Sequence, residues 1–568
     1  MKKAHLAILI LVSLLMASCF GNIILGIRSS GIKSPTLGNI LKIGIFERNS
    51  PAVLDPIDSW DSVSNDMIRH VCDTLWSYDL VDPKLPITMR LATSYFWNAE
   101  MDELTVSLRN DVWFHNGAKF NATAVKFTFD RITYFINASG TLPDTTHVCD
   151  PSYLFFNMDG NPILNRIEII DEYTIKLILN KPNSFFIPVL SYEACSILHP
   201  NSTPAKEYLE FQEEDILIGT GPFKYVYLIP GDELRIERFN MYWGSATYWD
   251  EIIWMYYPDT TTINNALLDG KVDYLRDPLI SLIPTFQADD NIIIVEMNTS
   301  TTFRYWAINN DRINDTNIRK AMAYAYNYSN FIEEFQQGYA IEAEQFLPPG
   351  FPFYNASFKA PYYNISIARQ TLKEAFPIET VGLTAQAYGE NSTNDDAWSD
   401  LILATYTFDP FAWMYPEITQ RIINALFSDM DKIGIEMGVV SWNQYIFPYN
   451  PPPIWYAAWW PDYLDPFNML EPILNNMSSS SYLQNNDYLI HKWLKQYEDI
   501  DPTNITGRKE LVYKIQQRAI NELYLLLPIS FDKTYFVHHR SLGGVGYNIQ
   551  GNLWLTDSYF IPGIPRAK

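Results

Sequence analysis

The chain has 568 residues, several times the usual domain length of about 100 to 200 residues, with 47% hydrophobic and 19% charged residues. These values are typical of a large globular protein and exclude a single small module and a disordered chain. Its 41 Lys and Arg against 65 Asp and Glu give a net charge of −24, which would repel nucleic acid or another polyanion. Aromatic residues reach 15%. Surplus rings often line binding sites, although core packing accounts for most single rings.

The first 27 residues have the order of a secretory signal, with the charged start Met1–Lys3, a long apolar run and the small residues Ser18-Cys19. Apolar character resumes up to Ile27, so residues 1–27 are predicted to be either a cleaved signal peptide or an uncleaved anchor. Cys19 is also a candidate lipid-anchor residue, because MASC resembles a lipoprotein box with Met at its first position. We therefore expect an exported protein, extracellular or periplasmic, tethered to the outer face of the cell membrane.

Four cysteines occur, and from the three that follow Cys19 we expect a Cys149–Cys195 disulfide and one spare thiol, Cys72. No CxxC is present, so a structural zinc site has no support. Asn-X-Ser/Thr triplets are dense and predict a glycoprotein. They begin at Asn121, Asn137, Asn201, Asn298, Asn314, Asn327, Asn355, Asn364, Asn391, Asn476 and Asn504.

Residues 28–40 are rich in Ser, Gly and Pro, which is typical of a linker. The folded body is predicted to begin near Ile40 with the strand LKIGIF, followed by apolar residues at helical spacing. Residues 104–132 predict a strand, an Asn-Gly turn and a helix that begins near Asn121. Strands and helices alternate in this way along the chain, which favours an α/β fold.

The stretch 104–132 also resembles a block of the family 5 extracellular solute-binding proteins, the peptide, nickel and oligosaccharide receptors of ABC importers. It keeps the family's Leu108-Arg109, Phe114-His115, Gly117, Phe120, Ala122, Ala124-Val125 and Phe127. Further blocks that resemble the family follow in the family's order at 219–244, 266–277, 305–340, 418–445 and 511–531. The order of the blocks along almost the whole body is a stronger signal than any single block.

The resemblance implies a two-lobed α/β fold like that of the periplasmic binding proteins of type II, in the large peptide-binding subclass with an inserted subdomain. Following the family, lobe I is expected to comprise 41–77, 206–296 and 523–568. The inserted subdomain is expected at 78–205 and lobe II at 297–522. The molecule is expected to be a monomer.

The segment WYAAWWPDYLDPFNML, 455–470, places two acids among aromatic rings. Asp462 falls where several peptide-binding members of the family hold the ligand's free α-amino group, and a capping or solvated acid remains the alternative. Asp465 precedes Pro466 and is better explained as a turn starter. With packing as the alternative for each ring, the ligand-binding candidates are Asp462, Trp460, Trp459, Tyr463 and Trp306.

An enzyme is not expected. Two carboxylates beside aromatic rings suit a glycoside hydrolase, but Asp462 and Asp465 are three residues apart in a segment that Pro461 and Pro466 interrupt. The sequence lacks the common nucleophile, zinc, phosphate and dinucleotide motifs, and its eight His show no metal-ligand spacing. We therefore predict no cofactor and no metal site.

By its resemblance, the chain is expected to be a receptor that captures peptides between two closing lobes and delivers them to the permease subunits of an ABC importer. The high aromatic content keeps an oligosaccharide receptor of the same family as an alternative. A cell-surface glycan-processing enzyme and a passive cell-surface adhesin are the alternatives from a different class.

Overall fold

The computed structural model describes residues 39–46, 53–143, 146–209, 216–276, 278–297, 299–376, 404–408, 416–439, 451–478, 480–481 and 483–565. The predicted signal or anchor, its Cys19, and nearly all of the predicted linker lie outside these residues, as do the sequons at Asn298 and Asn391. Among the described residues, no helix is both long and apolar enough to cross a membrane.

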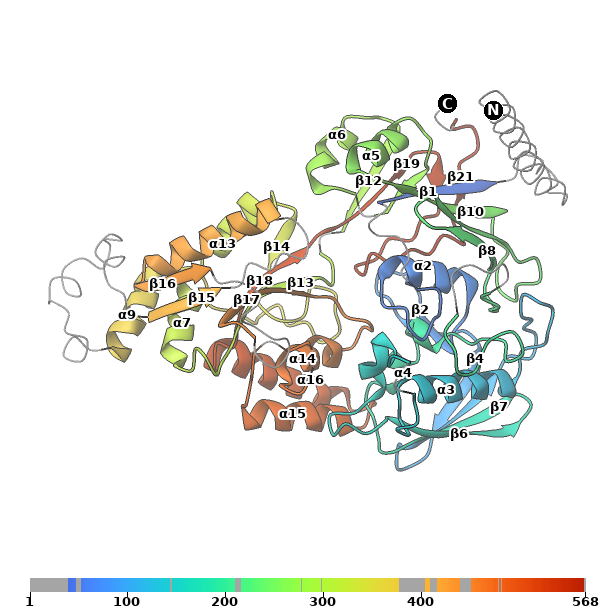
Figure 1. Cartoon of the computed structure of the whole chain (residues 1–568), viewed down its shortest axis with the longest axis horizontal. Helices are drawn as coiled ribbons and strands as arrows, with labels where there is room; N and C mark the ends of the chain where they lie inside the picture. Colours follow the sequence, from blue (N-terminus) through green and yellow to red (C-terminus); the bar gives the residue numbers. More distant parts are fainter. Residues whose placement is uncertain are drawn as a thin grey trace, which may run out of the picture. The chain divides into compact units, whose positions relative to one another are not determined.

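Seven strands from three separate parts of the chain form the first sheet, in the order β12-β19-β11-β1-β10-β9-β8. Figure 1 labels β1, β8, β10, β12 and β19 of this sheet. They are β1 (Ile40–Phe46), β8 (Phe223–Ile229), β9 (Glu233–Arg238), β10 (Glu251–Tyr257), β11 (Tyr274–Leu275), β12 (Ile292–Met297) and β19 (Thr534–His539). The associated helices are α2 (Ser62–Val71), α5 (Thr260–Leu268) and α6 (Ile283–Gln287), with the helical turn η4 (Ile280–Leu282). The predicted first strand is confirmed as β1, where Leu41, Ile43 and Ile45 are all buried.

A smaller sheet lies within the segment expected to be an insertion, in the strand order β4-β5-β7-β6. Its strands are β4 (Ala92–Trp97), β5 (Glu103–Leu108), β6 (Leu164–Asp171) and β7 (Thr174–Leu179), and a separate pair is β2 (Trp76–Tyr78) with β3 (Ile87–Met89). The helices of this segment are α3 (Ala122–Phe135) and α4 (Phe186–Val189), with the turns η2 (Asp150–Phe155) and η3 (Glu193–Cys195). Helix α3 begins after Asn121, as predicted, and packs against β6.

Six strands form the third sheet, in the order β14-β18-β13-β17-β15-β16. They are β13 (Phe303–Ile308), β14 (Ala340–Glu342), β15 (Ala404–Phe408), β16 (Ile435–Val439), β17 (Ile454–Trp459) and β18 (Leu526–Asp532). The helical elements are α7 (Thr316–Ala325), α8 (Tyr328–Asn330), η5 (Phe331–Phe335), α9 (Ile365–Ala375), α13 (Pro416–Asp431), α14 (Pro466–Leu474), α15 (Tyr488–Asp499), α16 (Ile505–Gln516) and η7 (Gln517–Glu522). The short pair β20 (Leu542–Gly543) and β21 (Tyr559–Phe560) follows near the C-terminus.

Alternation along β13 sends its side chains into two different cores. Phe303 and Tyr305 belong to the cluster that includes residues of α14 to α16, whereas Trp306 and Ile308 belong to the cluster with α7, α9 and α13. Because neighbouring residues of a strand point to opposite faces, the six-stranded sheet is covered on both sides.

The chain returns to the first sheet later than expected. The boundary at 522/523 is wrong for the strand pairing, because β18 pairs with β13 and β14 of the six-stranded sheet. Only Lys533 separates β18 from β19, which pairs with β12 and β11 of the first sheet. Every residue of β18 from Leu526 to Phe531 is buried, as expected for a strand with helices on both faces.

The predicted Cys149–Cys195 disulfide is absent, because Cys72, Cys149 and Cys195 are free thiols. All three are buried, and the Cys195 thiol donates to the carbonyl oxygen of Val189 at 3.6 Å. Burial raises the pKa of both the Cys149 and the Cys195 thiol. These cysteines therefore pack as small hydrophobic residues with an inert, protonated sulfur.

Helix capping accounts for part of the sequon pattern. Asn121, Asn327, Asn364 and Asn504 are each the N-cap of a helix, and each side-chain oxygen accepts a backbone N–H of the first turn. Asn is among the preferred N-cap residues because its oxygen satisfies an otherwise unpaired backbone donor. These four asparagines thus have a role in folding that does not depend on glycosylation.

A buried ion pair ties α3 to the segment that precedes α2. The Asp55 carboxylate accepts hydrogen bonds from both terminal nitrogens of Arg131, one at 2.8 Å, and from the Leu209 amide at 2.9 Å. Asp55 has no exposed surface and Arg131 is 3% exposed. Because each buried charge is hydrogen-bonded to its counter-charge, the ion pair stabilises the contact between the first sheet and the inserted segment.

We expect Asp55→Asn to lower the free energy of unfolding by about 3 to 5 kcal/mol, because the substitution leaves the Arg131 charge buried without a counter-charge. Urea unfolding of the purified protein measures this change. The matched control is Asp130→Asn, which breaks an exposed pair with Lys126 on the same helix and should cost less than about 1 kcal/mol. Equal losses for the two variants would contradict the prediction.

Candidate ligand-binding site

The segment between β17 and α14 carries both acids of the aromatic run. Asp465 is the N-cap of α14, and its carboxylate accepts from the Phe467 amide at 2.9 Å and the Tyr497 hydroxyl at 2.8 Å. It also forms an ion pair with Arg508 and is 4% exposed. The interpretation of Asp465 as a structural turn residue is confirmed.

Asp462 is half-buried and joins three parts of the chain. Its carboxylate accepts one hydrogen bond from Nε1 of Trp60 at 2.8 Å and another from the hydroxyl of Tyr153. Its own amide donates to Oδ1 of Asn468 at 2.7 Å. Trp60 precedes α2, Tyr153 lies in η2, and the centroids of their rings are 5.6 Å apart. Asp462 is thus an acid held in an aromatic surrounding by neutral donors.

Burial raises the pKa of the Asp462 carboxyl, and the hydrogen bonds from Tyr153, Trp60 and Asn468 oppose that shift. Burial disfavours the charged form, while donors aimed at the oxygens favour it. The side chains that donate hydrogen bonds to this carboxylate are all neutral. A positively charged group would therefore still be attracted to it.

The loop that presents Trp60 is braced on both sides. Nε2 of His147 is hydrogen-bonded to Oδ2 of Asp58 at 2.8 Å, and the Ser59 hydroxyl donates to Oδ1 of Asn65 at 2.8 Å. The Tyr192 hydroxyl donates to the Ser59 carbonyl at 3.1 Å. Sequence reasoning missed Trp60 and Tyr153 as site residues, because their separation from Asp462 by hundreds of residues leaves no local pattern.

The four aromatic candidates occupy different surroundings. Trp460 is 57% exposed, and Trp459 is half-buried with its Nε1 donating to the Asn468 carbonyl at 2.7 Å. Tyr463 is 2% exposed and stacks on Phe185 with a centroid distance of 5.8 Å. Trp459 and Trp460 thus keep exposed surface close in sequence to Asp462, whereas Tyr463 packs.

Trp306 does not lie on a ligand surface in this structure. It has no exposed area and packs in the core cluster of α7, α9 and α13, with ring centroids 5.2 Å from Tyr456 and 6.2 Å from Tyr326. The strand that carries it was predicted correctly, but its side chain points to the helical layer. We therefore correct the prediction that Trp306 contacts a ligand.

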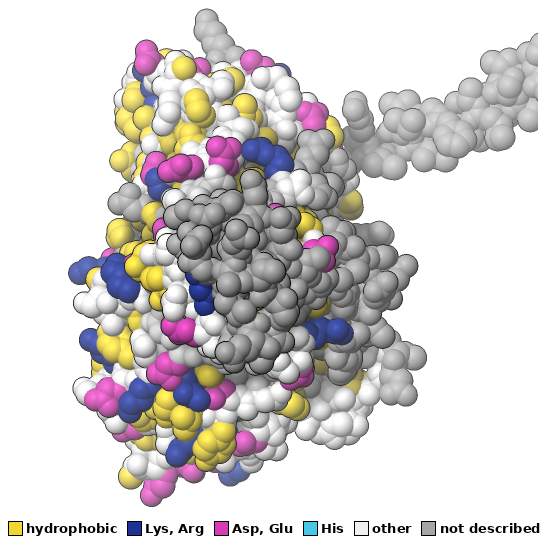
Figure 2. Space-filling model, turned by 90° about the vertical axis from the view of Figure 1, so that its left-hand side faces the viewer, with side chains coloured by type: hydrophobic (Ala, Val, Ile, Leu, Met, Phe, Trp, Pro, Cys, Tyr) yellow, Lys and Arg dark blue, Asp and Glu magenta, His cyan; other side chains and the backbone are white. Residues whose placement is uncertain are grey.

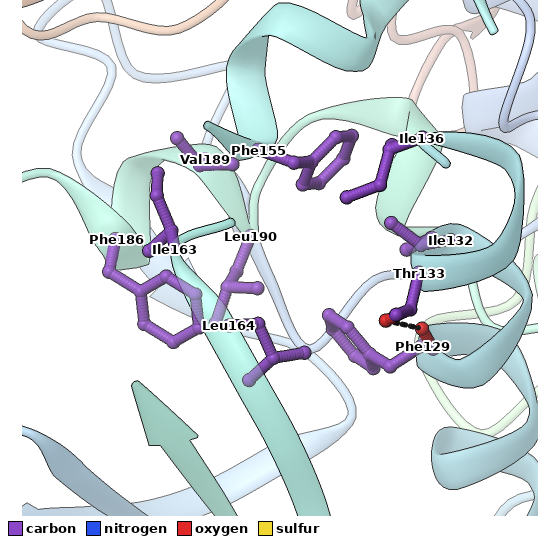
Figure 3. A pocket seen from close by; sticks show the side chains of 10 residues that line it. All are labelled: Phe129, Ile132, Thr133, Ile136, Phe155, Ile163, Leu164, Phe186, Val189 and Leu190. Carbon is purple, nitrogen blue, oxygen red and sulfur yellow. Dashed lines mark hydrogen bonds between the residues drawn. The ribbon is translucent and has the colours of Figure 1, made fainter. Parts of the chain in front are cut away.

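Two other features of the described residues bear on where a solute could bind. An apolar cavity of about 10 Å³ lies between α3, β6 and α4, lined by Phe129, Phe155 and eight further side chains (Figure 3). It has room for about one water molecule, so it does not fit a solute. On the face shown in Figure 2, the described acidic, basic and hydrophobic side chains are interspersed, so no charge of one sign dominates it.

Residues 86–481, more than half of the chain, match a sequence-family model. Its description is bacterial extracellular solute-binding proteins, family 5, middle region. The chain belongs to this family. As a family 5 protein, it is placed among solute-binding proteins that work outside the cytoplasm, and the resemblance recognised in its sequence blocks is confirmed.

Curated relatives agree with the family. The chain is 28% identical over 326 residues to the glutathione-binding protein GsiB of Pectobacterium atrosepticum, covering 57% of this chain and 59% of that protein. It is 25% identical over 364 residues to the dipeptide-binding protein of Escherichia coli, covering 62% and 63% respectively. The alignments thus span less than two thirds of the length of these relatives.

A solved structure confirms the expected fold class. The periplasmic binding protein DppA from Helicobacter pylori, in complex with the peptide STSA, superposes with a TM-score of 0.73 at 20% sequence identity. The superposition covers 92% of this chain and 98% of that one. The family 5 protein described here therefore has the α/β fold of the type II periplasmic binding proteins of the peptide-binding type.

We expect Asp462→Asn to change how stability depends on pH. A carboxyl whose folded pKa lies above the ordinary value of 3.8 stabilises the fold below that value, and this contribution is lost as the pH rises through the folded pKa. The unfolding free energy of the unsubstituted protein should therefore fall, relative to that of the variant, as the pH rises from about 4. Urea titrations between pH 3.5 and 8 measure the free energy of unfolding of both proteins. A value for the unsubstituted protein that rises with pH relative to that of the variant would contradict the prediction.

Proposed function

We propose that this protein is the substrate-binding receptor of an ABC importer, which captures peptides between two closing lobes and delivers them to the permease. The observation that carries the proposal is the Asp462 carboxylate, which is enclosed by the neutral donors of Trp60 and Tyr153. A free α-amino group supplies the positive charge that this carboxylate lacks, and a charge-assisted hydrogen bond is about twice as strong as a neutral one. Relatives named for dipeptide and glutathione binding support a peptide cargo.

The proposed lobes correspond to the two large sheets, with the inserted segment beside the first. Trp60 and Tyr153 would contact the ligand from one side, and Asp462 and Trp460 from the other. A ligand that bridges both sides stabilises the closed arrangement by the contacts it makes only there. The two places where a strand of one sheet continues into a strand of the other, β12 to β13 and β18 to β19, are suited to act as hinges.

An oligosaccharide receptor is the second candidate, because Trp60 is 39% and Trp460 57% exposed and both can stack on a sugar ring. A glycan-processing enzyme is disfavoured by the second acid. Asp465 is buried, caps α14 and is paired with Arg508, so it is not available as the partner carboxylate of Asp462.

The exported location follows from the family, and the N-terminal segment would tether the receptor to the membrane, either through Cys19 or as an uncleaved anchor. Glycosylation at exposed sequons such as Asn201 and Asn314 is part of the same proposal. A monomeric receptor suffices, since the site draws on one chain only.

Calorimetric titration tests the proposed interaction between Asp462 and the α-amino group of a peptide. A mixture of short peptides with free amino termini should bind, and the same mixture acetylated at the amino termini should bind at least about tenfold more weakly. Asp462→Asn should weaken binding of the free-amine peptides by a similar factor, because the ion pair is lost. Asp501→Asn, at an exposed acid, is the matched control and should bind like the unsubstituted protein.

Equal affinity for free and acetylated peptides, with no effect of Asp462→Asn, would refute recognition of the α-amino group by Asp462. Binding of an oligosaccharide mixture in place of peptides would establish the second candidate. Release of reducing sugars from that mixture by the purified protein would instead revive the enzyme.

A further inference from the structure

A polar pocket of about 240 Å³ lies in the inserted segment, between the turn that follows η2 and the end of β7. Sites for drug-sized ligands usually measure about 300 to 1,000 Å³, so this pocket has room for one small molecule and not for a chain. Its lining is polar or charged at every position except one proline, and it includes none of the residues proposed to contact a peptide. The lining residues are Asn157, Asp159, Asn161, Pro162, Asn180 and Lys181.

The first wall of the pocket is a turn that its own hydrogen bonds hold in place. Oδ1 of Asn157 accepts from the amides of Asp159 at 3.0 Å and Asn161 at 3.1 Å. The Asn157 amide donates to the Asn161 carbonyl at 2.9 Å. Gly160 has a φ of 76°, a conformation that favours glycine. The groups that face the pocket therefore need little reordering to bind a ligand.

The facing wall is fixed in the same way. Asn180 donates from Nδ2 to the Pro162 carbonyl at 2.7 Å, and its Oδ1 accepts from Nδ2 of Asn165 at 2.6 Å. Both polar atoms of the Asn180 side chain are thus used within the fold. The groups that remain for a ligand come mainly from the turn.

Asn157 brings to the pocket a hydrogen-bond donor that the fold does not use. The residue is 6% exposed, and its Nδ2 has no hydrogen-bond partner among the residues that the structure describes. Leaving such a donor unpaired is unfavourable, so an acceptor in the pocket would be stabilised there. Within the same described residues, Oδ1 of Asp159 and both polar atoms of the Asn161 side chain also have no partner.

The charges beside the pocket nearly cancel. Nζ of Lys181 lies 2.6 Å from Oδ2 of Asp159, and Nζ of Lys495 lies 2.6 Å from the same oxygen. Lys181 is also 3.5 Å from Glu498 and 3.4 Å from Asp499. An anion would meet these carboxylates and a cation would meet the two lysines. The pocket therefore suits a neutral ligand that both donates and accepts hydrogen bonds.

We propose that this pocket binds one neutral sugar ring, either a free monosaccharide or the terminal sugar of a glycan. A hydroxyl group both donates and accepts hydrogen bonds. Neighbouring hydroxyls of a sugar can therefore accept from Nδ2 of Asn157 and donate to Oδ1 of Asp159 or of Asn161. This second site lies outside the one that contains Asp462. It goes beyond the proposed import of peptides and does not depend on it.

Saturation-transfer NMR of the full-length protein tests the proposal. The probes are glucose, galactose, mannose and N-acetylglucosamine, each as the free sugar and as the methyl glycoside, with glycine and acetate as charged comparators. At least one sugar should bind with a dissociation constant of about 1 to 10 mM, because hydrogen bonds alone hold a small ligand weakly. Glycine and acetate should give no signal. Binding of the methyl glycoside would identify the terminal sugar of a glycan as the ligand, and binding of the free sugar alone would identify a monosaccharide.

Two variants locate the bound sugar. Asn157→Asp keeps the oxygen that closes the turn and replaces the free donor by an acceptor, and Asn161→Ala removes a side chain that no described residue bonds. Each should weaken sugar binding by about tenfold or more. Asn161→Ala should also leave the unfolding temperature unchanged, since its side chain is exposed. Asn317→Ala, at an exposed asparagine of α7, is the matched control and should bind like the unsubstituted protein.

Three results would overturn the proposal. They are no signal from any sugar, a signal from glycine or acetate in place of the sugars, and sugar binding that neither pocket variant weakens. The last result would place the sugar elsewhere on the protein. No peptide enters these measurements, so their failure is distinct from a failure of the peptide titration.

Discussion

The two large sheets are joined at two places where the chain passes directly from a strand of one sheet to a strand of the other, and the segment that carries Asp462 is tied to the rest of the chain through these junctions. β12 precedes β13 by a few residues, and only Lys533 lies between β18 and β19. At this junction Arg304 of β13 forms a two-pronged ion pair with Asp532 at the end of β18, with both distances at 2.7 Å. The ion pair therefore holds β13 and β18 together at the point where the chain passes between the two sheets.

The remaining contacts between the parts are made by side chains, and they fall into two groups. Asp462 meets Trp60 and Tyr153, and Phe185 meets Tyr463 and Phe467. The short segment that precedes α14 takes part in both groups. Asp465 fixes this segment in place, because it caps α14, accepts a hydrogen bond from Tyr497 and forms an ion pair with Arg508.

Local chemistry made much of the fold predictable from sequence. Asn121 as a helix start, Asp465 as a turn residue and the strand at β1 all follow from preferences that act within a few residues. Trp306 was misjudged because identifying a strand does not tell which of its two faces meets a ligand. Trp60, Tyr153 and Phe185 were missed because their partners are remote in sequence. The boundary at 522/523 was misplaced because β18, which belongs to the six-stranded sheet, is separated from β19 of the first sheet by Lys533 alone.

The free thiols bear on how the chain reaches its folded form after export. Cys72, Cys149 and Cys195 are all buried and unlinked, so the described fold does not depend on an oxidant or a disulfide isomerase. The same burial that keeps them unreactive in the folded protein is missing while the chain is unfolded. Completion of the fold therefore encloses the Cys149 and Cys195 thiols and removes them from reaction with oxidants and with one another.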